Sequence, residues 1–189
     1  MFVLLENDSI TKTVPSNRGI TIGENQYPRA IYTSWSPAER EAIGIYEVVY
    51  DNSNRKDGEY YTNTNQSLNF ADGKVTASHG SATAKELADV TNKDSTIDPG
   101  LKSQHKEKIK QQASSLLTLN DWYVIKATEV DSYSVPAEIT TYRAAIRTAS
   151  NDMEVLIDAC STVDELAALY VYNKDNPPVR PLGEFPEAI

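Results

Sequence analysis

The sequence predicts an α+β fold, in which a small β-rich N-terminal domain precedes a C-terminal α-helical hairpin domain. Residues 1–78 carry short runs of β-branched and aromatic residues between polar turns, whereas residues 101–172 carry apolar residues at helical spacing. Between them, the polar residues 79–100 end in an Asp-Pro-Gly turn, and we interpret them as a linker. Residues 173–189 are rich in proline, which predicts an extended tail.

Strands are expected throughout the first domain. Residues 2–5 form a short apolar run, residues 9–14 alternate weakly, and residues 45–50 are the clearest strand, because β-branched and aromatic side chains suit a pleated surface. Residues 59–70 and 75–77 are also compatible with strands. Asp72 and Gly73 stand between these two segments, and both tolerate the positive φ that a tight turn needs. We therefore expect a β-hairpin at Asp72-Gly73.

One short helix is expected inside the β-rich domain, over residues 36–44. Ser36 is the predicted N-cap and Pro37 takes the first helical position, where its missing N–H costs nothing. Gly44 is the predicted stop. A partial helix over residues 82–90 is a further expectation for the linker.

The second domain is expected to contain four helical segments. The first covers residues 101–117, with His105, Ile109 and Ala113 on its apolar face, and a break follows at residues 120–123. The second begins at Pro136 and buries a stripe made of Ile139, Tyr142, Ile146 and Ala149. Asn151-Asp152 predicts another break, before a third, short helix through Cys160. Thr162 and Glu165 have the spacing of a capping box, which predicts a last helix through Leu169.

Charge and composition argue against nucleic acid as the main partner and against an anionic membrane surface. The formal net charge is −9 and the pI is about 4.7, whereas binding to nucleic-acid phosphates or to an anionic membrane surface needs clustered Lys and Arg. No apolar run approaches the ~20 residues that cross a bilayer, and the first residues lack the basic region of a signal peptide. The single cysteine allows no intrachain disulfide. We expect a protein made in a reducing cytoplasm.

Residues that could carry chemistry are sparse. His79 and His105 are the only histidines, and neither has the spacing of a metal ligand pair. A nucleophile pair of Cys160 and His105 is conceivable, but a small buried thiol and a packed histidine explain both residues more simply. The sequence therefore predicts no catalytic residue, no metal site and no cofactor, and we expect the chain not to be an enzyme.

Four short motifs stand in order in the second half of the chain. They are Leu116-Leu117, Asp121-Trp122, Val135-Pro136 and Tyr142–Arg147. This order resembles the C-terminal helical hairpin of bacteriophage tail-fibre assembly proteins, in which a helix ends in an "LL…DW" pattern, a short loop carries a proline, and a second helix contains "YR…LR". The resemblance covers about a quarter of the chain and implies an antiparallel helical hairpin.

The first half resembles, more loosely, N-terminal segments of proteins associated with phage tail fibres. There a "YP…W" segment precedes a short helix, and the next strand opens with Gly and an aliphatic residue. The matching residues are Tyr27-Pro28, Trp35 and Gly44-Ile45. Assembly proteins of this kind stop soon after the "YR…LR" helix, whereas this chain continues with a further helical segment and a proline tail that lacks tryptophan.

The resemblance implies a role in a phage tail, and two classes of function compete. In the first, the chain is a non-enzymatic structural protein of the virion tail, an adaptor or accessory that links the tail fibre to the baseplate or tail. In the second, it is a tail-fibre assembly chaperone that is absent from the mature virion. Either role implies other tail proteins as partners (fibre, baseplate or tail tube), in several copies of a symmetric assembly, with no nucleic acid and no membrane. The extra C-terminal segments favour the structural role.

Six residues are candidates for contact with such partners: Tyr27, Trp35, Trp122, Tyr142, Arg143 and Arg147. Trp122 would either plug the loop end of the helical hairpin or serve as an interface anchor, because Trp is enriched at binding hot spots. Arg143 and Arg147 lie one helical turn apart and could hold carboxylates of a partner or of this chain, although a solvated face explains them more simply. Core packing is the alternative role for each aromatic residue.

Overall fold

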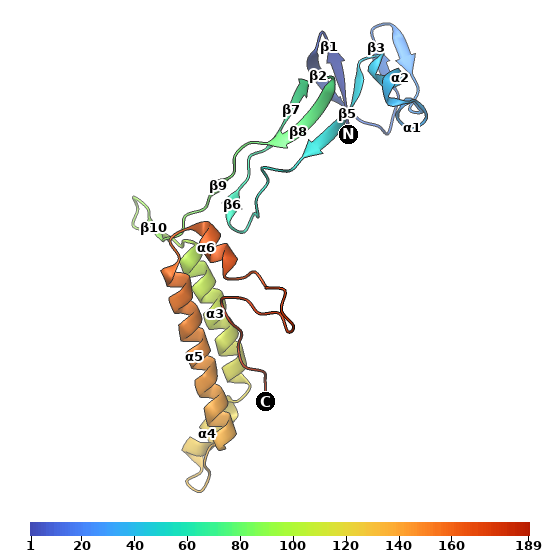
Figure 1. Cartoon of the computed structure of the whole chain (residues 1–189). Coiled ribbons are helices and arrows are strands. Elements are labelled where there is room, and N and C mark those ends of the chain that lie inside the picture. Colours follow the sequence, from blue (N-terminus) through green and yellow to red (C-terminus); the bar gives the residue numbers. More distant parts are fainter. The chain divides into compact units, whose positions relative to one another are not determined.

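The structure is a computed structural model that describes all of residues 1–189, and it confirms the α+β fold class (Figure 1). The chain divides into two compact units, Met1–Thr83 and Ala84–Ile189. A five-stranded sheet dominates the first unit, and helices dominate the second.

The sheet of the first unit has the strand order β2-β1-β5-β8-β7. Its strands are β1 (Phe2–Glu6), β2 (Ser9–Val14), β5 (Ile45–Asp51), β7 (Gln66–Ala71) and β8 (Lys74–His79). Neighbours are antiparallel except β5 and β8, which run parallel. The two edge strands β2 and β7 also approach each other, so the sheet curls on itself.

Strand β1 is buried on both faces, which explains why its sequence is apolar without alternation. Val3 and Leu5 face one core cluster together with Val48, Val75 and Ala77. Phe2 and Leu4 face the opposite cluster, which also holds Val14, Ile31, Tyr32 and Ile45. Successive strand residues point to opposite faces, and this unit therefore has an apolar layer on each side of β1.

The second of these clusters is closed by a small lobe that the sequence predicts only in part. It contains β3 (Ile20–Ile22), β4 (Asn25–Tyr27), α1 (Ile31–Ser34) and α2 (Pro37–Glu41). Helix α2 confirms the predicted helix after Ser36: the Ser36 hydroxyl accepts from the Glu39 amide, and the Glu39 carboxylate accepts from the Ser36 amide. Gly44 follows with φ of +81°, as the predicted stop requires.

The hairpin expected at Asp72-Gly73 is confirmed. These two residues have φ of +52° and +71° and join β7 to β8, with Ala71 opposite Lys74. Two positive φ values match the twist of the flanking strands. On either side of this hairpin in the sequence, β6 (Tyr61–Thr62) and β9 (Thr83–Ala84) pair as a separate two-stranded sheet. Strands β10 (Val90–Thr91) and β11 (Ile97–Asp98) form another.

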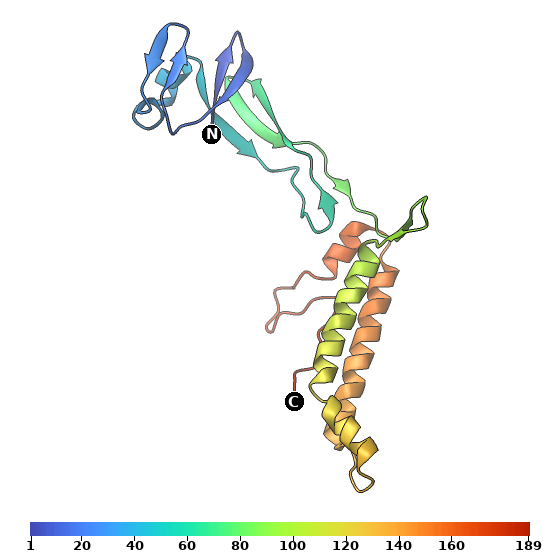
Figure 2. The same cartoon turned by 180° about the vertical axis from the view of Figure 1, so that it is seen from behind.

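The second unit is built on two long helices, α3 (Leu101–Thr118) and α5 (Ala137–Ala159), which lie side by side in both views (Figures 1 and 2). They run antiparallel, because Lys106 near the start of α3 pairs with Asp158 near the end of α5 at 2.8 Å. At the opposite end, the Arg143 guanidinium of α5 donates to the Leu117 carbonyl of α3 at 2.6 Å. Helix α4 (Asp121–Glu129) lies in the connection, and α6 (Val163–Ala168) follows α5.

The core of this unit follows the predicted helical stripes. In α3 the buried residues are Leu101, His105, Ile109 and Ala113, and in α5 they include Ile139, Tyr142, Ile146, Met153 and Ile157. The predicted capping box is also present, since the Thr162 hydroxyl accepts from the Glu165 amide and the Glu165 carboxylate accepts from the Thr162 amide. This box opens α6, whose Val163 and Leu166 are buried.

Three local predictions are wrong. No helix forms over residues 82–90; the carbonyls of Glu86 and Leu87 instead accept from the first free amides of α3, those of Leu101 and Lys102. Asn151-Asp152 does not break α5, because both side chains are exposed while the buried face continues through Met153.

The predicted break at residues 120–123 is the third of these errors. Asn120 does precede a new helix, but Asp121, Trp122 and Tyr123 are the first turn of α4 rather than a loop. No Gly or Pro stands between residues 101 and 135, so nothing in this stretch prevents a helix from restarting.

The proline-rich tail returns along the helices of its own unit. Leu182 is buried, and its amide donates to the Leu169 carbonyl at 3.0 Å. Phe185 packs against the cluster that contains Ala113 and Ile146. The tail contains no helix or strand, but it is not extended throughout, because a bend brings the Asn173 amide to the Val179 carbonyl and a turn brings the Gly183 amide to the Arg180 carbonyl. Its contacts fasten it to the helical unit.

Candidate protein-interaction surface

Exposed apolar side chains gather on and just outside α4. They are Leu119, Trp122, Val124, Ile125 and Val130, and no residue of α4 is buried. Leu119, Trp122 and Ile125 are 65%, 51% and 54% exposed. Full burial of each such side chain would contribute ~1.5–3 kcal/mol, so a group of them left in water is a candidate interaction site.

The start of α4 is held in place by a partly buried ion pair. The Arg143 guanidinium lies 2.8 Å from the Asp121 carboxylate and also donates to the Leu117 carbonyl at 2.6 Å. Arg143 is buried, whereas Asp121 is about half exposed. This fork joins α5, the end of α3 and the first turn of α4, so it fixes the direction in which α4 leaves the helical pair.

The aromatic and cationic side chains of α4 support one another. Trp122 stacks on Tyr123 with ring centroids 4.1 Å apart. The Lys126 ammonium lies 5.4 Å from the Trp122 ring centroid and 4.3 Å from that of Tyr133. Trp122, Ile125 and Glu129 follow i, i+3, i+7 spacing and therefore share one face of the helix.

A groove of about 430 Å³ runs between α3 and α5 next to the start of α4. Its lining includes Lys110, Arg147, Ser150 and Asn151, together with the Asp121–Arg143 pair. Lys110 pairs with Glu154 at 3.3 Å. Arg147 is exposed and donates to the Arg143 carbonyl of its own helix at 3.4 Å, so its guanidinium remains open to solvent in this groove.

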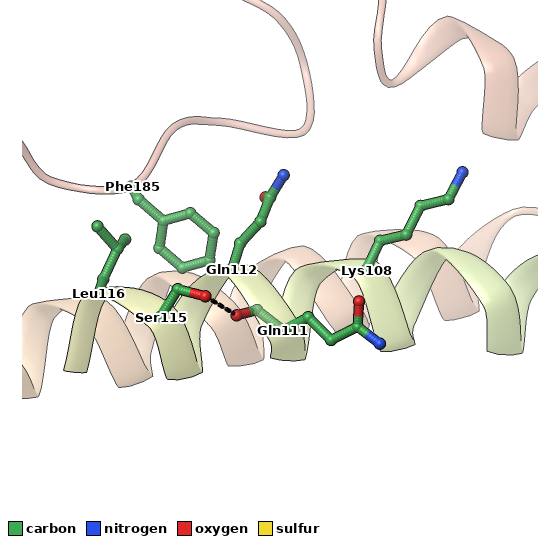
Figure 3. Close-up of a pocket in the computed structure, with 6 residues that line it drawn as sticks. All are labelled: Lys108, Gln111, Gln112, Ser115, Leu116 and Phe185. Carbon is green, nitrogen blue, oxygen red and sulfur yellow. Dashed lines mark hydrogen bonds between the residues drawn. The ribbon is translucent and has the colours of Figure 1, made fainter. Parts of the chain in front are cut away.

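A second groove, of about 510 Å³, lies on the other side of α3, where the tail crosses it (Figure 3). Phe185 of the tail stands over Leu116 and Ser115, while Gln111, Gln112 and Lys108 extend the groove along the helix. The Ser115 hydroxyl donates to the Gln111 carbonyl at 2.9 Å. Long polar side chains on an open helix face offer hydrogen bonds to an extended peptide but no enclosed space for a small molecule.

The structure separates the six residues predicted to contact partners. Tyr27 and Trp35 pack edge to face, with centroids 5.9 Å apart, against the lobe of the first unit, and both are half-buried. Tyr142 is buried between the long helices, and its hydroxyl has no hydrogen-bond partner.

Arg143 is buried and pairs with the Asp121 carboxylate of its own chain. It therefore does not lie on a solvated helix face, which was the simpler expectation for this residue. Trp122 does not plug the connection, since half of it is exposed. Trp122 and Arg147 are thus the two candidates that present their side chains to solvent. They lie on α4 and in the groove beside it.

Sequence reasoning named Trp122 but missed the other exposed apolar residues around it. Trp122 and Ile125 stand three residues apart, which is a helical signal inside a segment that we interpreted as a break. That spacing places both on one face of α4 but does not say whether another element covers that face.

The titratable residues considered for catalysis are bonded within the helical unit. The Nδ1 atom of His105 lies 2.7 Å from the Tyr170 hydroxyl, and both rings pack together. The Cys160 thiol is buried and donates to the Leu156 carbonyl at 3.4 Å. Burial, reinforced by the nearby Glu165 carboxylate, raises the pKa of Cys160, which disfavours the reactive thiolate.

Comparisons with known proteins give no family for this chain: no family model, no curated protein and no solved structure matches it. No helix combines the length and the apolar character needed to cross a membrane. The structure also brings no three His, Cys, Asp or Glu side chains into a metal-binding group.

Proposed function

We propose that this chain is a non-enzymatic structural protein of a bacteriophage tail, an adaptor or accessory that links the tail fibre to the baseplate or tail. The single observation that carries the proposal is that each of the two compact units has its own core and its own exposed apolar residues. Two independently packed units, each with a surface suited to another protein, are what an adaptor requires.

The first unit exposes Val49 and Tyr50 of β5, and each is about half exposed. The second unit exposes the apolar residues on and beside α4, and it also exposes others elsewhere, among them Val155 of α5 and Val171 after α6. The resemblance of the "LL…DW…P…YR…IR" residues to tail-fibre assembly proteins supports a tail as the place of action. The partners in this proposal are other tail proteins, one of which binds to β5 and another to α4.

Mass spectrometry of purified virions tests the proposal. Peptides of this chain would be quantified against those of the major capsid protein, whose copy number supplies an internal standard. We expect a fixed ratio that corresponds to a multiple of the tail symmetry.

Absence of this chain from purified virions would contradict the structural role. Absence from virions, together with recovery of the chain bound to fibre protein from infected cells, would refute the structural role in favour of an assembly chaperone that leaves before maturation. Absence from both would refute a tail function altogether.

A further inference from the structure

We infer that α4 docks into an apolar groove that is rimmed by lysine and arginine on a partner protein. This inference deepens the proposed function and rests on it, since it names the chemistry of one of the two partner surfaces. It arises from the pattern of apolar and acidic side chains on and beside this one helix.

The apolar part of the docking surface is a stripe. Trp122 and Ile125 lie on one face of α4, and Leu119 precedes that face at the same spacing of three. Amphipathic helices bind grooves through anchors at i, i+3, i+4 and i+7, and α4 supplies the first two of these with Trp122 and Ile125, while Lys126 and Glu129 occupy the other two. Trp122 is the expected principal anchor, because a large, rigid aromatic side chain gains most from leaving water.

The charged side chains next to the apolar stripe indicate which charges the rim of the partner's groove carries. Glu129 shares the face of Trp122 and Ile125, and Asp131 follows immediately after the helix; both are exposed. The nearby cation, Lys126, is drawn over the rings of Trp122 and Tyr133. A partner therefore meets two carboxylates at the end of the apolar stripe, and basic side chains around its groove complement them.

The same observations disfavour a second copy of this chain as the occupant. Each copy carries a net charge of −9, so two copies repel each other, whereas a partner with basic side chains is attracted.

Two synthetic amphipathic helical peptides test the inference with the full-length chain. They share one leucine stripe and differ only in their flanking positions, which are Lys in one and Glu in the other. Fluorescence anisotropy of each labelled peptide, measured at ~0.15 M salt where the Debye length is about 8 Å, gives the two affinities. We expect the Lys-flanked peptide to bind at least tenfold more tightly than the Glu-flanked peptide.

Variants locate the binding on α4. Trp122→Ala should lower the affinity for the Lys-flanked peptide by about 30-fold, which corresponds to loss of a hot-spot residue. The double variant E129K/D131K should lower the affinity for that peptide by about tenfold and raise the affinity for the Glu-flanked peptide. The matched control is D152K/E187K, which alters the net charge equally at two exposed carboxylates away from α4 and should change either affinity less than about twofold.

Circular dichroism of every variant establishes that the fold is retained. Equal affinity for the two peptides, equal weakening by the control variant, or no effect of Trp122→Ala would overturn the inference. Sedimentation of the chain alone provides a further check, because self-association that Trp122→Ala abolishes would assign the surface to a second copy. None of these results alters the virion measurement, so the two proposals fail separately.

Discussion

Replacing Arg143 by methionine should release α4 from the helical pair. Methionine keeps most of the length and apolar volume of the arginine stem but removes the guanidinium that contacts the Asp121 carboxylate and the Leu117 carbonyl. The change therefore removes the fork and leaves the surrounding packing in place. We expect α4 to fray while α3 and α5 remain paired.

The size of the effect depends on how much of the fork is shielded from water. A hydrogen bond to a charged group contributes about 1.5–3 kcal/mol, and breaking a fully buried ion pair costs about 3–5 kcal/mol. Arg143 is buried, but Asp121 is half exposed and regains hydration when its partner is lost. We therefore expect Arg143→Met to lower the free energy of unfolding by about 2 kcal/mol.

Urea unfolding followed by circular dichroism at 222 nm measures this loss, since the long helices α3 and α5 lie in the second unit and only the short α1 and α2 lie in the first. Arg147→Met is the matched control, because that side chain is exposed and makes one long bond to its own helix. Its effect should stay below about 0.5 kcal/mol. Equal free energies of unfolding for Arg143→Met and Arg147→Met would refute the reasoning. So would a double-mutant cycle in which Asp121→Asn lowers the free energy of unfolding as much in the Arg143→Met variant as in the chain that retains Arg143.

Three further predictions concern single residues. Tyr142→Phe should leave stability unchanged or raise it by up to ~1 kcal/mol, because it removes a buried hydroxyl that has no hydrogen-bond partner; a clear loss in urea unfolding would contradict this. Burial, with the charges of Glu59 and Asp57, raises the pKa of Tyr60 to about 12, so its neutral form contributes stability that is complete below pH 10 and is lost as the pH rises towards 12. Tyr60→Phe should therefore show a shallower loss of stability across that range in thermal melts, and an unchanged slope would count against it. Gly44→Ala should cost about 2 kcal/mol or more, because φ is +81° and the new methyl would lie 2.6 Å from the Leu5 carbonyl oxygen, whereas Gly73→Ala, with open space around it, should cost about 1 kcal/mol; equal thermal shifts would refute the steric part.

Local signals in the sequence were sufficient for several elements of the fold. The Asp72-Gly73 turn, the Ser36–Glu39 capping box and the Thr162–Glu165 capping box all appear as predicted. Each depends on backbone preferences and hydrogen bonds within a few residues, which the order of amino acids specifies directly. The buried stripes of α3 and α5 were predictable for a similar reason, because helical periodicity alone defines one apolar face.

Longer-range features escaped prediction. The break expected at Asn151-Asp152 does not occur, since packing of Met153 and Ile157 against the facing helix outweighs the weak helix preference of two exposed polar residues. From the sequence, a solvent-exposed helix face was the simpler expectation for Arg143. In the structure its guanidinium is buried, because the Asp121 carboxylate and the Leu117 carbonyl at the end of α3 lie next to it. Neither result follows from residues within one helical turn.

The sequence by itself determined the fold class, the ends of several helices and the acidic character that disfavours nucleic acid as a partner. The tertiary structure alone decided which apolar residues are covered. Trp122 and Tyr142 belong to similar helical patterns, but Tyr142 lies between α3 and α5, whereas nothing packs over the outer face of α4. Periodicity defines a face, and only the path of the rest of the chain determines whether that face becomes core or remains free to bind.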